Sequence, residues 1–226
     1  MNNSTLLDIW SKIRLLMKSH PWHGVPIGDN FPDTVTAYIE IVPTDTVKYE
    51  IDKHSGFLKV DRPQKYSNIC PTPYGFIPQT LCGERVADYC MEKTGRKDIV
   101  GDSDPLDICV ITEKVLNHSN ILLQAIPIGG LRMIDNHEAD DKIIAVMKDD
   151  AIFSDWKDIS QCSDSFIERL RHYFLTYKDA PGNEGKRCEI VSVYGMEEAY
   201  NVIKASNKDY LEKYSDLNNL LKREEL

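Results

Sequence analysis

Residues 101–111 read Gly-Asp-Ser-Asp-Pro-Leu-Asp-Ile-Cys-Val-Ile, three carboxylates that lead directly into a short apolar run. The apolar run is rich in β-branched side chains and predicts a strand. In an extended chain Asp102 and Asp104 would share one face and Asp107 would oppose them, but Pro105 forces a bend that can bring the third carboxylate round. The segment is therefore either a solvated acidic turn or, because carboxylates repel one another, a site for hard cations such as Mg²⁺ or Mn²⁺.

Short β-type runs on both sides of this segment indicate a small barrel. Residues 47–52 alternate strictly between apolar and charged side chains, residues 53–56 supply a turn, and residues 57–62 return as a partner strand, which predicts a hairpin. Other strand candidates are residues 36–42, 108–111, 122–128, 143–147 and 189–193. At least five strands thus lie between residues 36 and 147, a count that fits a small barrel.

Helical periodicity marks three segments: the two ends of the chain and a stretch that begins near Ser165. Residues 1–18 predict an amphipathic helix, because charged residues interrupt the apolar ones and leave no signal-peptide core. Ser165 and Glu168 form a possible capping box for a helix with an apolar stripe, and residues 196–221 predict a C-terminal helix. We expect one domain over residues 1–226, with a catalytic core at about 36–195.

The composition excludes some classes of protein. The 226 residues carry a formal charge of −9, the wrong sign for binding nucleic acid by bulk charge. No uninterrupted apolar run reaches the length of a membrane span, so a soluble protein is expected. Six cysteines without a Cys-x-x-Cys pair predict reduced thiols in a cytoplasmic protein, although Cys82 and Cys90 leave a disulfide or a metal site open.

Further charged residues accompany the acidic segment. Asp135 and Asp140 lie in a second acidic loop before the strand at 143–147. Basic and aromatic side chains stand near the ends of expected strands and helices: Lys48, Arg62, Lys142 and Lys178, beside Glu50, Tyr74 and Tyr177. Each alone is an ordinary surface residue. Together they supply carboxylates for several cations and enough positive charge for a small polyanion.

From residue 39 to residue 178 the chain resembles the family I soluble inorganic pyrophosphatases. The matching stretches are residues 39–41, 48–52, 60–62 and 71–75, the box Asp-x-Asp-Pro-x-Asp at 102–107, Asp135 with Asp140 and Lys142, and the pair 177–178. The order and spacing of the box relative to the lysine strand and the Tyr-Lys pair argue against coincidence. The resemblance implies an α+β fold with a mainly β core, a five-stranded OB-type β-barrel with flanking α-helices. It also implies Mg²⁺-dependent hydrolysis of pyrophosphate to two orthophosphates.

The resemblance implies a role for each site residue. The metal ligands would be Asp102, Asp107, Asp135 and Asp140, with Glu50 near a further, substrate-associated ion. Asp104 would accept a proton from the nucleophilic water held between two metals, and Glu40 would support the site electrostatically. The two phosphoryl groups would be held by Lys48, Arg62, Tyr74, Lys142, Tyr177 and Lys178. Several Mg²⁺ ions are expected, with Mn²⁺ or Zn²⁺ as substitutes, in a homo-oligomer that is a hexamer or a dimer, with no nucleic-acid or membrane partner.

Three departures from the family pattern stand out. Cys70 replaces a tyrosine that in relatives points towards the phosphate site, so a tyrosine introduced here is expected to lower the Michaelis constant or leave it unchanged. Asn136 replaces a common acidic residue. Residues 82–100 form an insertion relative to short bacterial members, with a helical centre at 84–93. We expect a surface excursion near the rim of the active site that lies outside the chemistry, with a role in subunit contact or metal regulation as the alternative.

Three rival interpretations fit less well. An EF-hand requires glycine where Asp107 stands, and the residues that follow are β-rich. A nucleic-acid-binding OB module would show a basic groove with aromatic platforms rather than clustered carboxylates. A phosphatase with an aspartyl nucleophile needs an apolar strand before its Asp-x-Asp motif, and here the strand follows the motif.

Overall fold

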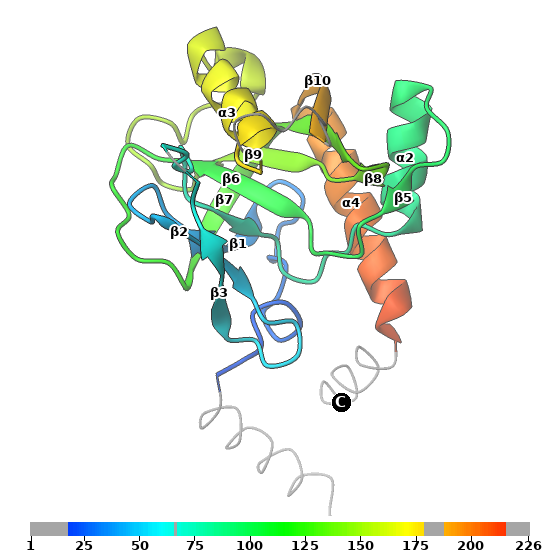
Figure 1. The fold of residues 1–226 in the computed structure, drawn as a ribbon, viewed down its shortest axis with the longest axis horizontal. Helices are drawn as coiled ribbons and strands as arrows, with labels where there is room; N and C mark the ends of the chain where they lie inside the picture. The colour runs from blue at the N-terminus through cyan, green and yellow to red at the C-terminus, as the bar shows by residue number, and fades with distance from the viewer. Residues whose placement is uncertain (1–17, 66, 179–187, 216–226) are drawn as a thin grey trace, which may run out of the picture.

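Five strands form a closed ring in the computed structural model, which describes residues 18–65, 67–178 and 188–215 (Figure 1). The ring runs β1 (Val35–Ile41), β4 (Tyr74–Phe76), β6 (Asp107–Ile111), β9 (Lys142–Met147) and β7 (Ile121–Asp135). It closes because β1 pairs with both β4 and β7. A closed ring leaves no unpaired edge among these strands. The predicted five-stranded barrel is therefore confirmed.

The membership of the barrel differs from the strand candidates in the sequence. The hairpin of β2 (Val47–Ile51) and β3 (Leu58–Pro63) forms as predicted, but it makes a separate two-stranded sheet beside the barrel (Figure 1). The fifth barrel strand is β4, which is too short to show a periodic pattern. Its Gly75 lies so close to β1 that an added Cβ would stand 1.9 Å from the carbonyl oxygen of Tyr38.

The strand β7 is much longer than the predicted residues 122–128, because its two halves pair with different partners. Its first half pairs with β1 and its second half with β10 (Cys188–Gly195), while β9 pairs along its middle. Two short strands, β5 (Val100–Gly101) and β8 (Glu138–Ala139), extend the sheet next to the acidic loops.

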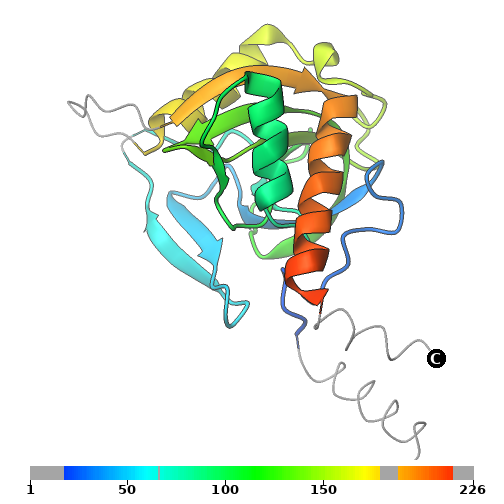
Figure 2. The same cartoon turned by 90° about the vertical axis from the view of Figure 1, so that its right-hand side faces the viewer.

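Within the described residues, three α-helices flank the barrel: α2 (Glu84–Thr94), α3 (Asp164–Thr176) and α4 (Met196–Lys213), with a short 3-10 helix η1 (Ile159–Gln161) before α3. Figure 2 shows α2 and α4 side by side on one side of the sheet. The cap of α3 is Ser163, whose Oγ accepts a hydrogen bond from the Phe166 amide at 3.3 Å, so the predicted capping box at Ser165 is wrong by two residues. Residues 1–17 of the predicted helix at 1–18 and residues 216–221 of the predicted C-terminal helix fall outside the described residues.

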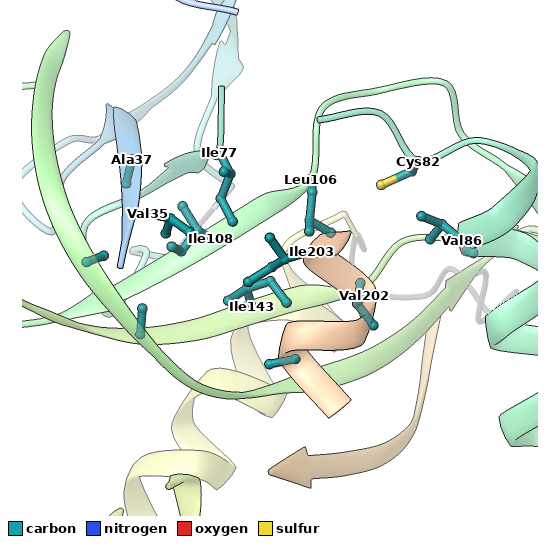
Figure 3. Packing of buried hydrophobic residues seen from close by; sticks show 14 of the residues in the cluster. Val35, Ala37, Ile77, Cys82, Val86, Leu106, Ile108, Ile143, Val202 and Ile203 are labelled. Carbon is teal, nitrogen blue, oxygen red and sulfur yellow. The ribbon is translucent and has the colours of Figure 1, made fainter. Parts of the chain in front are cut away.

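Alternate residues of the barrel strands enter two different apolar clusters. Ile108 and Ile143 belong to a cluster that includes residues of α2 and α4, and Figure 3 shows Val202 and Ile203 of α4 facing it. Their neighbours along the strands, such as Ile144, belong to a second cluster beneath α3. This alternation follows from the period of two in a strand. None of the helices within the described ranges is long and apolar enough to cross a membrane.

Candidate active site

A pocket of about 340 Å³ lies between the barrel and the β2–β3 hairpin, and every site residue singled out in the sequence lines it. The carboxylates are Glu40, Glu50, Asp102, Asp104, Asp107, Asp135 and Asp140. The other predicted residues are Lys48, Arg62, Tyr74, Lys142, Tyr177 and Lys178. They come from seven strands, two loops and the end of α3, so only the folded chain brings them together.

The first acidic loop folds back on itself instead of running extended. Ser103 has a φ of 62°, and the Asp104 amide donates a hydrogen bond to Asp102 Oδ1 at 2.8 Å. This turn, rather than Pro105 alone, brings both carboxylates and Asp107 to one pocket.

The start of the insertion holds this loop in place through its backbone. The Cys82 amide donates to the Asp104 carbonyl at 2.8 Å, and the Ser103 amide donates to the Cys82 carbonyl at 3.0 Å. The Leu106 amide donates to Thr80 Oγ1 at 2.9 Å. Of the described residues, none between 82 and 100 gives a side chain to the pocket.

The second acidic loop is a tight turn between β7 and β8. Asn136 and His137 both have positive φ, which suits a two-residue hairpin turn after Asp135. The Asp140 amide then donates to the Met133 carbonyl at 3.0 Å. Asp140 therefore stands beside the end of β7, and it lines the same pocket as Asp135.

Lys142 is the cation at the centre of the pocket, with 1% of its surface exposed. It stands opposite Asp107 in the parallel pairing of β6 and β9, and its ammonium contacts the carboxylates of Asp107 and Asp140. Burial lowers the pKa of Lys142, but these carboxylates outweigh it and raise the pKa well above its usual value. The ammonium therefore stays charged in the folded protein. Tyr74 completes the group, with its hydroxyl donating to Asp107 Oδ2 at 2.6 Å.

The hairpin brings two more cations to the pocket and orients them with one carboxylate. Lys48 Nζ lies 2.9 Å from Asp61 Oδ2, and Arg62 Nη1 lies 2.5 Å from the same oxygen. Arg62 also stands over the ring of Tyr177, with its Cζ 5.6 Å from the centroid. Arg62 Nη2 is buried and has no hydrogen-bond partner in the described part of the chain. A buried guanidinium nitrogen without a partner suits an anionic oxygen from a ligand.

The carboxylates suit hard cations. Burial and then the charge of Asp140 raise the pKa of Asp102, and burial raises the pKa of Asp140 to about 6, so positive charge is needed to keep both ionised. Asp135 Oδ1 is buried without a partner among the described residues. Within those residues no three His, Cys, Asp or Glu side chains converge on one point. Mg²⁺ does not require three, because it is commonly held by one or two carboxylates together with waters and substrate phosphates.

Three charged pocket residues were missed in the sequence: Lys53, Asp61 and Glu138. Asp61 stands next to Arg62 within a matching stretch, and Glu138 lies in the second acidic loop, so position could have indicated both. Lys53 lies in the hairpin turn, where it forms an ion pair with Asp104 across the pocket. No local pattern predicts that contact, because it depends on how the hairpin sits on the barrel.

Cys70 does not line the pocket. It has no exposed surface and belongs to the cluster beneath α3, with Tyr173 and Phe174. The expectation that a tyrosine at this position would approach the phosphate site therefore conflicts with its surroundings in this chain. All six cysteines are buried and unpaired, so Cys82 and Cys90 form no disulfide.

A small closed barrel with a carboxylate-rich pocket, balanced by lysine and arginine side chains, suits the class of metal-dependent hydrolases that act on small phosphorylated anions. The family model described as inorganic pyrophosphatase matches residues 37–211. An inorganic pyrophosphatase of Chlamydia caviae is 53% identical over 199 residues, which cover 86% of this chain and 92% of the relative.

Two solved structures of inorganic pyrophosphatases have folds similar to that of this chain. The inorganic pyrophosphatase of Thermus thermophilus has a TM-score of 0.71 and 27% identity, covering 85% of this chain and 99% of its own. That of Helicobacter pylori has a TM-score of 0.68 and 31% identity, covering 82% and 98%. The chain belongs to the family I inorganic pyrophosphatases, hydrolases that use a divalent metal cofactor.

Proposed function

We propose that this pocket hydrolyses inorganic pyrophosphate to two orthophosphates with Mg²⁺, and that the residues lining it act as the family resemblance implies. The observation that carries the proposal is the pairing of opposite charges in one pocket: seven predicted carboxylates with Lys48, Arg62, Lys142 and Lys178. Such a pocket suits a substrate that is itself highly negative and that arrives with cations.

The metal-holding residues are Asp102, Asp107, Asp135 and Asp140, with Glu50 near a substrate-associated ion. Asp135 has a buried oxygen without a partner among the described residues, and of the proposed metal-holding residues Asp102 and Asp140 have pKa values that burial raises. When bound, Mg²⁺ supplies charge neutralisation for the phosphate oxygens and a lower pKa for the attacking water. Mn²⁺ or Zn²⁺ are proposed substitutes, because both accept carboxylate oxygens.

The substrate-holding residues are Lys48, Arg62, Tyr74, Lys142, Tyr177 and Lys178. Lys142 and Lys178 pair with carboxylates in the described structure, and both can exchange them for phosphate oxygens once cations neutralise those carboxylates. Arg62 needs no exchange, since its Nη2 already lacks a partner among the described residues. Its planar fork suits two oxygens of one phosphoryl group.

Asp104 acts as the proton acceptor, and Glu40 supports the site from behind. The side chain of Asp104 is 46% exposed and pairs only with Lys53 among the described residues, so it is free to reach a water at the pocket mouth. Glu40 is buried and accepts a hydrogen bond from the hairpin backbone, so it holds the hairpin beside the pocket.

We also propose a cytoplasmic location and a homo-oligomer, a hexamer or a dimer. Six unpaired thiols suit a reducing compartment. Exposed Val191 and Val193 on β10 give that strand an apolar outer side suited to a subunit contact. Sedimentation velocity on the purified protein tests the oligomer.

The test of the activity is phosphate release from pyrophosphate with Mg²⁺ present and then chelated. Rapid release that stops in excess chelator is expected. Equal turnover of p-nitrophenyl phosphate, or full activity in the chelator, would overturn the proposal.

A further inference from the structure

Residues 140–142 send alternate side chains to opposite sides of the sheet. Asp140 and Lys142 line the pocket, whereas Asp141 between them does not. Asp141 lies on the same side of the strand as Ile143, which belongs to the cluster that includes residues of α2 and α4. Only 2% of its surface is exposed, so its charge is buried directly behind the active site.

The partner of this buried carboxylate is Arg132 of β7, which has no exposed surface. Arg132 Nε and Nη2 donate hydrogen bonds to Asp141 Oδ2 at 3.3 and 3.1 Å. The hydroxyl of Tyr194 on β10 donates to the same oxygen at 2.9 Å. Asp141 is thus held by residues of two other strands, β7 and β10.

The insertion and the C-terminal helix close around this ion pair. The guanidinium of Arg132 lies over the rings of Tyr89 from α2 and Tyr194, at 5.1 and 4.8 Å from their centroids. Glu198 of α4 forms a second ion pair, with its Oε1 2.8 Å from Arg132 Nη1. A guanidinium over aromatic rings gains cation–π attraction, and more when water is excluded.

We propose that Arg132, Asp141 and Tyr89 are positioning residues that fix the backbone of 140–142 so that Asp140 and Lys142 face the pocket together. This inference rests on the proposed function of those two residues. If the strand shifted by one residue or turned about its axis, Asp141 would leave its partners, and Asp140 and Lys142 would turn away from the pocket. Such a movement would also separate two buried charges, which the protein interior opposes strongly.

The proposal gives the insertion a function although it adds no side chain to the pocket. Tyr89 is its contact with Arg132, and through Arg132 it acts on the strand that carries Lys142. The insertion was expected to lie outside the chemistry. Under this proposal it supplies no reacting group, but it helps to place Asp140 and Lys142.

Four variants test the proposal. Arg132→Met removes the counter-charge and the hydrogen bonds, Arg132→Lys keeps the charge without the planar fork, and Tyr89→Leu removes only the stacking from the insertion. The matched control is Asp150→Asn, a buried carboxylate beyond the far end of β9. Asp150 is 3% exposed and accepts hydrogen bonds from Thr112 Oγ1 and the Glu113 amide at 2.7 and 2.9 Å, so its loss also lowers stability.

Three measurements separate positioning from stability. Hydrogen–deuterium exchange of the peptide covering residues 138–143 is followed without metal or substrate. The dissociation constant for Mg²⁺ is measured by calorimetry, and the Michaelis constant and turnover number are measured for pyrophosphate. All variants are compared with Asp150→Asn at the same interval below their own melting temperatures.

For Arg132→Met we expect faster exchange at 138–143, Mg²⁺ binding weakened by about tenfold, and a larger change in the Michaelis constant than in turnover. Tyr89→Leu should change the same quantities in the same direction by less, and Arg132→Lys should recover part of the loss. If Arg132→Met does not fold, Tyr89→Leu decides. Exchange and Mg²⁺ affinity equal to those of Asp150→Asn would make the ion pair merely structural. A wild-type protein that binds Mg²⁺ but does not hydrolyse pyrophosphate would instead overturn the proposed function and leave the exchange comparison valid.

Discussion

Glu40 Oε1 accepts a hydrogen bond from the backbone amide of Ile51 at 2.6 Å, and this bond joins barrel strand β1 to the hairpin strand β2. In the described part of the chain the hairpin shares no strand pairing with the barrel, so contacts of this kind decide where Lys48 and Glu50 stand over the pocket. Glu40 is 6% exposed, so its carboxyl group is a buried contact between the two sheets.

The buried position of Glu40 predicts a pH dependence of stability. Burial raises the pKa of Glu40 to about 8 from its ordinary value near 4.5, so the folded protein favours the protonated acid. Its contribution to stability is therefore complete below about pH 4.5 and is lost as the pH rises through about 8. Between pH 5 and 9 the metal-free wild type should lose on the order of 4 kcal/mol relative to Glu40→Gln, because the two pKa values differ by several units. Urea unfolding of both proteins at both pH values measures this, and a constant difference between them would contradict it.

Asp107 and Asp104 should respond differently when each becomes asparagine. Asp107 sits between Lys142 and Tyr74 at the start of β6, where a neutral amide cannot balance adjacent cations. Asp107→Asn is therefore expected to lose both Mg²⁺ affinity and turnover. Asp104→Asn should keep most of the Mg²⁺ affinity but lose about 10²- to 10⁴-fold in maximal rate, the scale of general-base catalysis.

Alkaline rescue separates the two roles further. For Asp104→Asn, part of the rate should return at high pH, because more of the attacking water ionises without a proton acceptor. Calorimetric titration of Mg²⁺ beside a pH–rate profile gives the comparison. An equal loss of Mg²⁺ binding in both variants, without recovery at high pH, would make Asp104 another metal ligand.

The pocket should distinguish Mg²⁺ from Ca²⁺. Ca²⁺ prefers longer bonds and more oxygen ligands, so it should occupy the carboxylates without placing the water correctly. We expect Mg²⁺ to support rapid phosphate release and added Ca²⁺ to inhibit it. Competition between the two ions, followed by phosphate release at fixed pyrophosphate, measures the effect. Undiminished turnover with Ca²⁺ alone would contradict it.

Cys70→Tyr should destabilise the fold rather than improve substrate binding. Cys70 is fully buried against residues of α3, so the larger ring overpacks the cluster at a cost of about 1–3 kcal/mol. The Michaelis constant of the remaining folded enzyme should change little, because this position does not line the pocket. Thermal unfolding and kinetics of Cys70→Tyr, with Cys70→Ser as the small-residue control, test this. A lower Michaelis constant with unchanged stability would show that the ring reaches the site.

The sequence by itself determined the chemistry and most of the elements. Strict alternation at 47–52 predicted the hairpin. The family resemblance carried by the box at 102–107, with its spacing to the strand of Lys48 and to Tyr177 and Lys178, identified residues that all line one pocket. Local patterns succeed here because strand periodicity and carboxylate spacing are properties of neighbouring residues.

Only the tertiary structure decided the relationships between distant residues. It placed the hairpin outside the barrel, made the three-residue β4 a barrel strand, and put Cys70 in the core. It also paired Arg132 with Asp141 and brought Tyr89 of the insertion over them. No local pattern encodes these contacts, because each depends on the burial of side chains from several elements at once. A buried charge is tolerated only where the complete fold supplies its partner.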